Sequence, residues 1–155
     1  MIRSLLRLLV LCFVFLAPPA LAQAPQVLPT SPLTILTTKG PVKFTAELAK
    51  TEDQKAKGLM FRKSMPADVG MLFDYGADTS NVAFWMQNTF IPLDMLFIKA
   101  DGRILNIHER AIPHNLSSIF AAGPVRAVLE LNGGTVARLG IKPGDRVEHA
   151  IFSGK

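Results

Sequence analysis

The stretch LDMLFIKADGRILNIHE, residues 93–109, decides the fold. Its first six residues are apolar on both alternating faces except for one aspartate, a pattern that predicts a strand buried on both sides. An Asp-Gly pair then marks a tight hairpin turn, and the last seven residues return as the partner strand. The stretch therefore predicts an antiparallel strand pair inside a sheet.

Further strands are predicted on both sides of this pair, because runs of alternating apolar and β-branched residues are bounded by turn residues. They cover residues 33–38, 42–49, 70–75, 82–87, 125–131 and 147–152. Helical signals are few. Thr51 and Gln54 form a capping-box pattern at the start of one short helix, and Gly133 and Gly134 open another.

These elements predict one α+β domain, a small β-rich and barrel-like sheet of about eight short strands with two short helices. An open sheet in which strands alternate with helices is disfavoured, because such a fold needs more and longer helices than the sequence provides. A long loop is expected over residues 110–124.

The first 22 residues have the order of features found in a secretory signal peptide. Arg3 and Arg7 precede a wholly apolar run over residues 8–16, and small residues then lead to an expected cleavage site between Ala22 and Gln23. The apolar run is shorter than the ~20 residues that a membrane-spanning helix needs. We therefore expect cleavage, with a retained membrane anchor as the alternative.

Cleavage would leave a mature chain that is periplasmic or secreted, monomeric and without a stable membrane span. Its Pro-rich residues 23–32 are expected to be disordered or to form an extended linker. Residues 33–155 are then the single domain, which is long enough to bury a core.

Composition excludes several classes of function. The only cysteine, Cys12, lies inside the predicted signal peptide, so the mature chain has no disulfide and no thiol nucleophile. The whole chain has 17 Lys and Arg against 12 Asp and Glu, and removal of Arg3 and Arg7 leaves 15 against 12, a net charge of +3. Basic residues form no run and are not interleaved with aromatic residues, which argues against nucleic acid as a partner.

The histidines do not predict a metal site. His108 and Glu109 are neighbours on opposite faces of a strand, so a regular strand cannot direct both to one ion. The methionines lie among apolar residues, which is typical of core side chains. We expect neither a bound metal nor a cofactor.

Four stretches together resemble the family known as domain of unknown function 192, DUF192. They are GLMFR (58–62), GMLF (70–73), FWMQNTFIPLDMLFI (84–98) and VLELNGGTVARLGIKPGD (128–145). The pattern Phe-Trp-Met-x-Asn-Thr-x-x-Pro-Leu-Asp is the most specific. Gln87 stands where the family usually has lysine, and Lys99 where an acid is common. The resemblance implies a compact β-rich fold and no established activity.

Six residues are candidates for a ligand-binding site: Arg62, Trp85, Asn88, Thr89, Asp94 and Glu130. Alternation along residues 82–87 places Trp85 opposite its apolar neighbours, where it would form an aromatic floor for a sugar ring or another planar group. Asn88 and Thr89 would donate hydrogen bonds beside it. The alternative is that Trp85 is simply a core residue.

Two carboxylates leave alternatives open. Asp94 interrupts an apolar strand, so it either accepts hydrogen bonds from Asn88 and Thr89 as a structural group or holds a ligand. Glu130 either forms a rim ion pair, with Arg62 or Arg126 as the cation, or joins the other candidates in one polar cluster.

The leading hypothesis is therefore an exported binding or accessory module for a polar, saccharide-like ligand, its partner being a small molecule or an envelope component. A second hypothesis is a small hydrolase or lyase that uses Asp94 and Glu130 as acid and base. A third is a protein-interaction domain. No catalytic residue can be assigned from the sequence.

Overall fold

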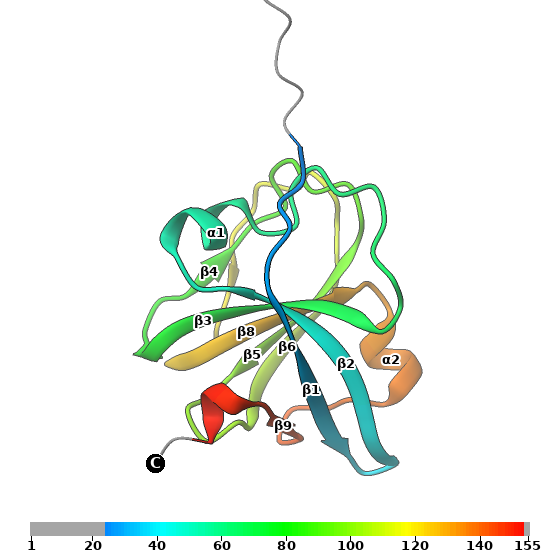
Figure 1. Ribbon diagram of the computed structural model, residues 1–155, viewed down its shortest axis with the longest axis vertical. Helices are drawn as coiled ribbons and strands as arrows, with labels where there is room; N and C mark the ends of the chain where they lie inside the picture. Colours follow the sequence, from blue (N-terminus) through cyan, green and yellow to red (C-terminus); the bar gives the residue numbers. More distant parts are fainter. Residues whose placement is uncertain (1–23, 154–155) are drawn as a thin grey trace, which may run out of the picture.

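The computed structural model describes residues 24–153, so the predicted signal peptide and its cleavage site lie outside the described residues. Within residues 24–153 there are nine strands, two α-helices and one short 3₁₀-helix (Figure 1). The strands are β1 (Thr30–Thr37), β2 (Gly40–Ala49), β3 (Val69–Thr79), β4 (Ala83–Phe84), β5 (Leu93–Ile98), β6 (Ile104–Ala111), β7 (Ile119–Phe120), β8 (Val125–Asn132) and β9 (Arg146–Glu148). The helices are α1 (Glu52–Lys57), α2 (Thr135–Leu139) and η1 (Ala150–Phe152). None of these helices is long and apolar enough to cross a membrane.

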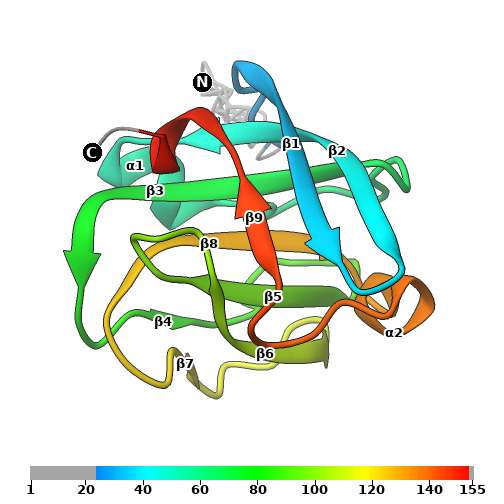
Figure 2. The same ribbon diagram turned by 90° about the horizontal axis from the view of Figure 1, so that it is seen from below.

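Seven strands form one curled sheet in the order β6-β5-β8-β3-β2-β1-β9 (Figure 2). Strands β4 and β7 form a separate two-stranded sheet. All neighbouring strands are antiparallel except β2 and β3, which run parallel because α1 and the following loop carry the chain across between them. The expected β-rich, barrel-like α+β fold is confirmed.

Strand β5 lies inside the sheet, between β6 and β8, and all six of its residues are buried. The two faces of the sheet carry separate cores, as a strand that is apolar on both faces requires. Phe73, Met95 and Phe97 belong to the first core, and Leu96 and Leu129 belong to the second. The predicted buried strand and its Asp-Gly hairpin are both confirmed.

The capping box predicted at Thr51 is present. The Thr51 hydroxyl accepts a hydrogen bond from the Gln54 N–H at 3.3 Å, and the Gln54 side chain accepts one from the Thr51 N–H at 3.1 Å. The helix ends at Gly58, whose φ of 47° suits a residue without a β-carbon. Local chemistry thus fixes both ends of α1, which later forms one wall of the candidate site.

The two outer strands of the large sheet meet at one point. Arg103, just before β6, pairs with Arg146 at the start of β9 in an isolated antiparallel bridge. Backbone hydrogen bonds from Ile104 to Asp145 (2.9 Å) and from Val147 to Gly102 (2.8 Å) support this bridge. The sheet therefore curls far enough for its edges to touch.

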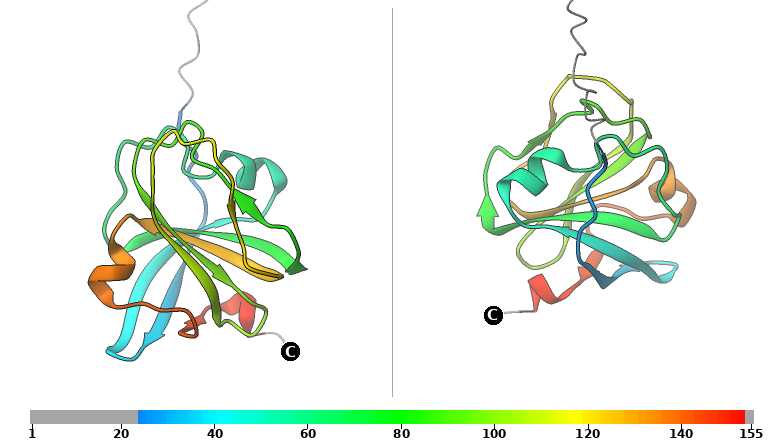
Figure 3. Two further views of the ribbon diagram at one scale, coloured as in Figure 1. Left: turned by 180° about the vertical axis from the view of Figure 1, so that it is seen from behind. Right: turned by 45° about the horizontal axis from the view of Figure 1, so that its top comes forward.

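Two loops lie side by side at the end of the molecule where the described chain begins (Figure 3). The Met86 N–H donates to Asn115, at 2.9 Å, and the His114 N–H donates to the Met86 carbonyl at 3.1 Å. Helix η1, the last described element, lies at the opposite end (Figure 1). The loop that follows β4 is therefore tied to the loop that precedes β7.

Several predicted boundaries differ from the structure. Strand β1 begins at Thr30, and the preceding Pro-rich segment packs against the domain: Leu28 is buried, and the Gln26 side chain donates to two backbone carbonyls at α1, each at 2.9 Å. The described part of that segment is thus not an extended linker. The strand expected over residues 147–152 is shorter, because the chain turns into η1 after His149.

Candidate functional site

A pocket of about 250 Å³ lies between α1, β3, β4 and β8, and we name it the Glu130 pocket. Three of the predicted site residues line it: Trp85, Thr89 and Glu130. Its other lining residues are Glu52, Lys55, Ala56, Lys57, Gly58, Leu59, Met60, Phe73, Tyr75, Ala83 and Phe84. The pocket joins an aromatic and aliphatic lining to one buried carboxyl group.

Pairing of the strands places Glu130 on the first core's face of the sheet. It lies opposite Met71 of β3 and Met95 of β5, and directly opposed residues share a face. Both methionines are fully buried, and Glu130 is 3% exposed. Burial of the carboxyl group in this apolar setting raises its pKa from 4.5 to about 8.

The Glu130 carboxyl group is left without a protein partner. Within residues 24–153, no side-chain hydrogen bond and no ion pair involves it; the two arginines expected as its partners pair elsewhere, Arg62 with Glu47 and Arg126 with Asp74. No side-chain oxygen in that part of the chain is both fully occluded and unpaired, so the Glu130 oxygens keep contact with the pocket space. A buried carboxyl facing a pocket in this way is available to a ligand.

The wall of the pocket carries polar and aromatic groups. The Lys55 ammonium lies 4.7 Å from the centre of the Tyr75 ring and 2.7 Å from the Glu52 carboxylate. Burial raises the pKa of Tyr75 to about 12, with further contributions from the charges of Glu130 and Glu52. The Tyr75 hydroxyl therefore remains protonated at neutral pH.

Trp85 and Thr89 differ in their exposure to solvent. Trp85 is 51% exposed, so it is not a core residue, whereas the next residue, Met86, is fully buried. Thr89 is 5% exposed, and its hydroxyl donates to the Gln87 carbonyl at 3.2 Å. The indole thus offers an open aromatic surface, and the Thr89 hydroxyl keeps its capacity to accept a hydrogen bond.

Asp94 lies on the other face of the sheet from Glu130. It pairs with Leu131, and the next residue, Met95, pairs with Glu130, so alternation directs the two carboxyl groups to opposite sides. Their expected convergence is therefore wrong, and so is an acid–base pair formed by these two groups. The sequence of one strand does not reveal which residue of another lies opposite it.

The partners expected for Asp94 are also different. Its carboxylate accepts backbone hydrogen bonds from Arg110 at 2.8 Å, Gly134 at 3.0 Å and Val136 at 2.8 Å. These donors lie at the end of β6 and the start of α2, not at Asn88 and Thr89 as expected. Asp94 is a structural acceptor that joins three elements.

Arg62 and Asn88 lie outside the Glu130 pocket. Both terminal nitrogens of Arg62 bond the Glu47 carboxylate, at 2.6 and 2.5 Å, and one also donates to the Gln26 carbonyl at 2.9 Å. The Asn88 carbonyl accepts the Phe61 N–H at 2.8 Å, and its φ of 53° shapes the loop. The predicted ion pair between Arg62 and Glu130 is thus wrong.

Tyr75 and Lys55 were missed by the sequence reasoning. Tyr75 is the only tyrosine, and alternation within the predicted strand 70–75 places it on the same face as Phe73. This alternation could have identified Tyr75 from the sequence alone. The approach of Lys55 to Tyr75 could not be predicted, because it depends on how α1 crosses from β2 to β3.

Within residues 24–153, no three His, Cys, Asp or Glu side chains group as metal ligands.

Comparison with known proteins assigns a family to this β-rich domain. The family model of DUF192, described as "Uncharacterized ACR", matches residues 34–149. The chain belongs to the DUF192 family. The resemblance seen in its sequence motifs is therefore confirmed, and no curated protein matches this DUF192 chain.

Two solved structures are similar to the DUF192 chain. One is a Sinorhizobium meliloti 1021 protein with the provisional description of a transcription regulator. It shares 48% identity and a TM-score of 0.78, over 81% of this chain and 98% of that one. The other is a Novosphingobium aromaticivorans DSM 12444 protein of unknown function, at 47% identity and a TM-score of 0.77, over 83% of this chain and 94% of that one.

Proposed function

We propose that this protein is an exported binding module and that its ligand occupies the Glu130 pocket. The observation that carries the proposal is a carboxyl group, 3% exposed and without a protein partner, that faces a pocket bordered by an exposed indole. A pocket with an apolar lining and a few convergent polar groups is the usual form of a small-molecule site.

The chemistry of the pocket favours a neutral polar ligand. With a pKa of about 8, Glu130 is mostly protonated at neutral pH, and a protonated carboxyl both donates and accepts hydrogen bonds. Lys55 and Lys57 also line the pocket, which disfavours a cation. A hydroxyl-rich ring stacked on Trp85 meets these conditions, so the proposed ligand is saccharide-like.

The small volume limits how much of such a ligand is enclosed. The pocket holds about 250 Å³, below the range typical of sites that surround a drug-sized molecule. We therefore propose that one sugar ring or a chain end enters it, while the remainder of a larger envelope component stays outside.

The proposal is tested with the purified protein and a panel of mono- and disaccharides in a thermal-shift screen. A ligand that binds only the folded state raises the melting temperature. We expect Trp85→Ala and Glu130→Gln each to weaken binding of a hit by about tenfold or more. Phe120→Ala is the matched control, since Phe120 is also an exposed aromatic residue but does not line the pocket.

A hit whose affinity is unchanged in Trp85→Ala and Glu130→Gln would bind elsewhere and would contradict the proposal. So would a panel without any hit. A pull-down partner that binds wild type and both pocket variants equally would instead favour the protein-interaction hypothesis.

Export is the second part of the proposal, and it rests on the sequence of residues 1–22. N-terminal sequencing of the protein recovered from the periplasm or culture medium is expected to begin at Gln23. Recovery of the intact N-terminus in the membrane fraction would instead indicate a retained anchor.

A further inference from the structure

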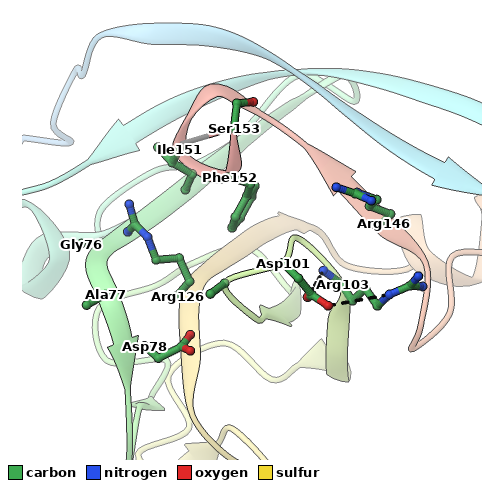
Figure 4. Close-up of a pocket in the computed structure, with 11 residues that line it drawn as sticks. Gly76, Ala77, Asp78, Asp101, Arg103, Arg126, Arg146, Ile151, Phe152 and Ser153 are labelled. Atoms are coloured by element: carbon green, nitrogen blue, oxygen red, sulfur yellow. Dashed lines mark hydrogen bonds and ion pairs between the residues drawn. The ribbon is translucent and has the colours of Figure 1, made fainter. Parts of the chain in front are cut away.

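A second hollow, of about 780 Å³, lies beside the start of β8, whereas Glu130 lies near the end of that strand. Figure 4 shows the residues that line this hollow. Three arginines from separate segments line it: Arg103 before β6, Arg126 of β8 and Arg146 of β9. We name it the arginine hollow. Its volume lies within the range of established small-molecule sites.

Two of these arginines are held directly opposite each other. Arg103 and Arg146 are the partners of the isolated bridge that joins the two edges of the sheet. Like charges at directly opposed positions destabilise a strand pair. The bridge also requires Gly102, because a β-carbon there would lie 2.6 Å from the Val147 carbonyl oxygen. The fold thus fixes the backbones of two arginines at directly opposed positions.

Neighbouring carboxylates leave part of this positive charge uncompensated. Arg126 is paired with Asp74 and is largely buried. The Nε of Arg103 lies 3.7 Å from Asp101, in an exposed pair that contributes little. Within residues 24–153, Arg146 has no ion pair at 4 Å or less.

One wall of the hollow is apolar. Ile151 and Phe152 of η1 line it, and Figure 4 shows the Phe152 ring directed into the space between Arg126 and Arg146. A simple inorganic anion would leave this wall unused. The combination of two arginines at opposed backbone positions and an aromatic ring suits an anion that carries an organic group.

We propose that the arginine hollow binds an organic phosphate, with Arg103 and Arg146 holding the phosphate oxygens and Phe152 contacting the organic group. A phosphate monoester carries a charge of about −1.5 to −2 at neutral pH, which offsets two arginines, whereas a carboxylate offsets one. Asp78 and Asp101 also line the hollow, so a bound anion must gain more from the arginines than it loses to these two carboxylates.

The test is isothermal titration of the purified protein at low salt with inorganic phosphate, phenyl phosphate and benzoate. We expect phenyl phosphate to bind most tightly. Benzoate should bind at least about tenfold more weakly than phenyl phosphate. Arg103→Gln and Arg146→Gln should each weaken phenyl phosphate binding by about tenfold or more. Arg138→Gln in α2, outside the hollow, and Trp85→Ala, in the other pocket, should leave it unchanged.

A second measurement does not depend on a ligand. Without added anion and at low ionic strength, Arg146→Gln should raise the melting temperature because it removes the like-charge pair. Absence of phenyl phosphate binding up to about 10 mM, together with absence of binding to vesicles that contain phosphatidic acid, would overturn the proposal. Binding that persists unchanged in Arg146→Gln would also overturn it, since the anion would then bind nonspecifically.

Vesicles distinguish the two sources of such a phosphate. Arginine-dependent binding to vesicles that contain phosphatidic acid, without binding of phenyl phosphate, would assign the site to a lipid headgroup. Arginine-dependent binding of phenyl phosphate, without vesicle binding, would assign it to a soluble phosphate ester.

Discussion

The carboxylate of Asp94 accepts a hydrogen bond of 2.8 Å from the backbone N–H of Val136, in the first turn of α2. The same side chain also accepts from Gly134 and Arg110, so one group joins β5, the end of β6 and α2. Helix α2 has no side-chain cap of its own at its start. Asp94 supplies this cap from a neighbouring strand, which explains why a carboxylate occupies an otherwise apolar strand.

Substitution Asp94→Asn tests this role. An amide would place N–H groups against backbone donors, so we expect the free energy of unfolding to fall by about 2–4 kcal/mol in urea denaturation. Asp68→Asn, at an exposed position, should change it little. Unchanged stability combined with loss of saccharide binding would instead assign Asp94 to the ligand site.

Glu130 should make stability depend on pH. Below pH 4.5 the carboxyl is protonated in both states, but between 4.5 and about 8 the folded state keeps the proton that the unfolded state loses. The folded state then binds more protons, so its stability falls as pH rises through this window and the loss is complete above it. We expect Glu130→Gln to remove this loss in urea denaturation curves taken across the window.

Glu109→Gln is the control for this prediction, since Glu109 is exposed and should retain the wild-type pH dependence. Identical slopes in wild type and Glu130→Gln would show that Glu130 titrates in the folded protein near its ordinary pKa.

Arg62 and Glu47 form a largely buried pair, with side chains 13% and 11% exposed. Removal of one partner leaves the other as an uncompensated charge, so Arg62→Met should lower the free energy of unfolding by about 3 kcal/mol. The double variant with Glu47→Met should recover much of that loss, because it removes both charges. A double-mutant cycle measures the coupling, and additive losses would show that the pair is not coupled.

Gly133 should not tolerate a side chain. A β-carbon there would lie 2.9 Å from Cβ and 3.0 Å from the backbone carbonyl carbon of Pro92. We expect Gly133→Ala to lower the melting temperature, with a cost of about 1–3 kcal/mol. Gly123→Ala is the matched control, because its β-carbon would meet Leu105 at an ordinary 3.6 Å.

The sequence predicts features that depend on local chemistry. The Asp-Gly turn leads from β5 to β6, and Thr51 with Gln54 caps α1, since each feature is decided by a few consecutive residues. Apolar residues on both faces of β5 likewise predict its position inside the sheet.

Features that join distant segments could not be predicted in this way. Asp94 and Glu130 occupy opposite faces because of the register between β5 and β8, which neither strand reveals alone. The pairing of Arg62 with Glu47 requires the loop after α1 to return across β2. Of the six candidate residues, the structure brings Trp85, Thr89 and Glu130 to one pocket, and it places the others elsewhere.

Strand β1, near the start of the described chain, pairs with β9, near its end. More than a hundred residues separate Ile35 from its partner Val147, so this contact has a high sequence separation and forms slowly. The sheet cannot close until almost the whole polypeptide is available. The export that we propose for this chain would gain from that delay, because premature folding would block passage across a membrane in extended form.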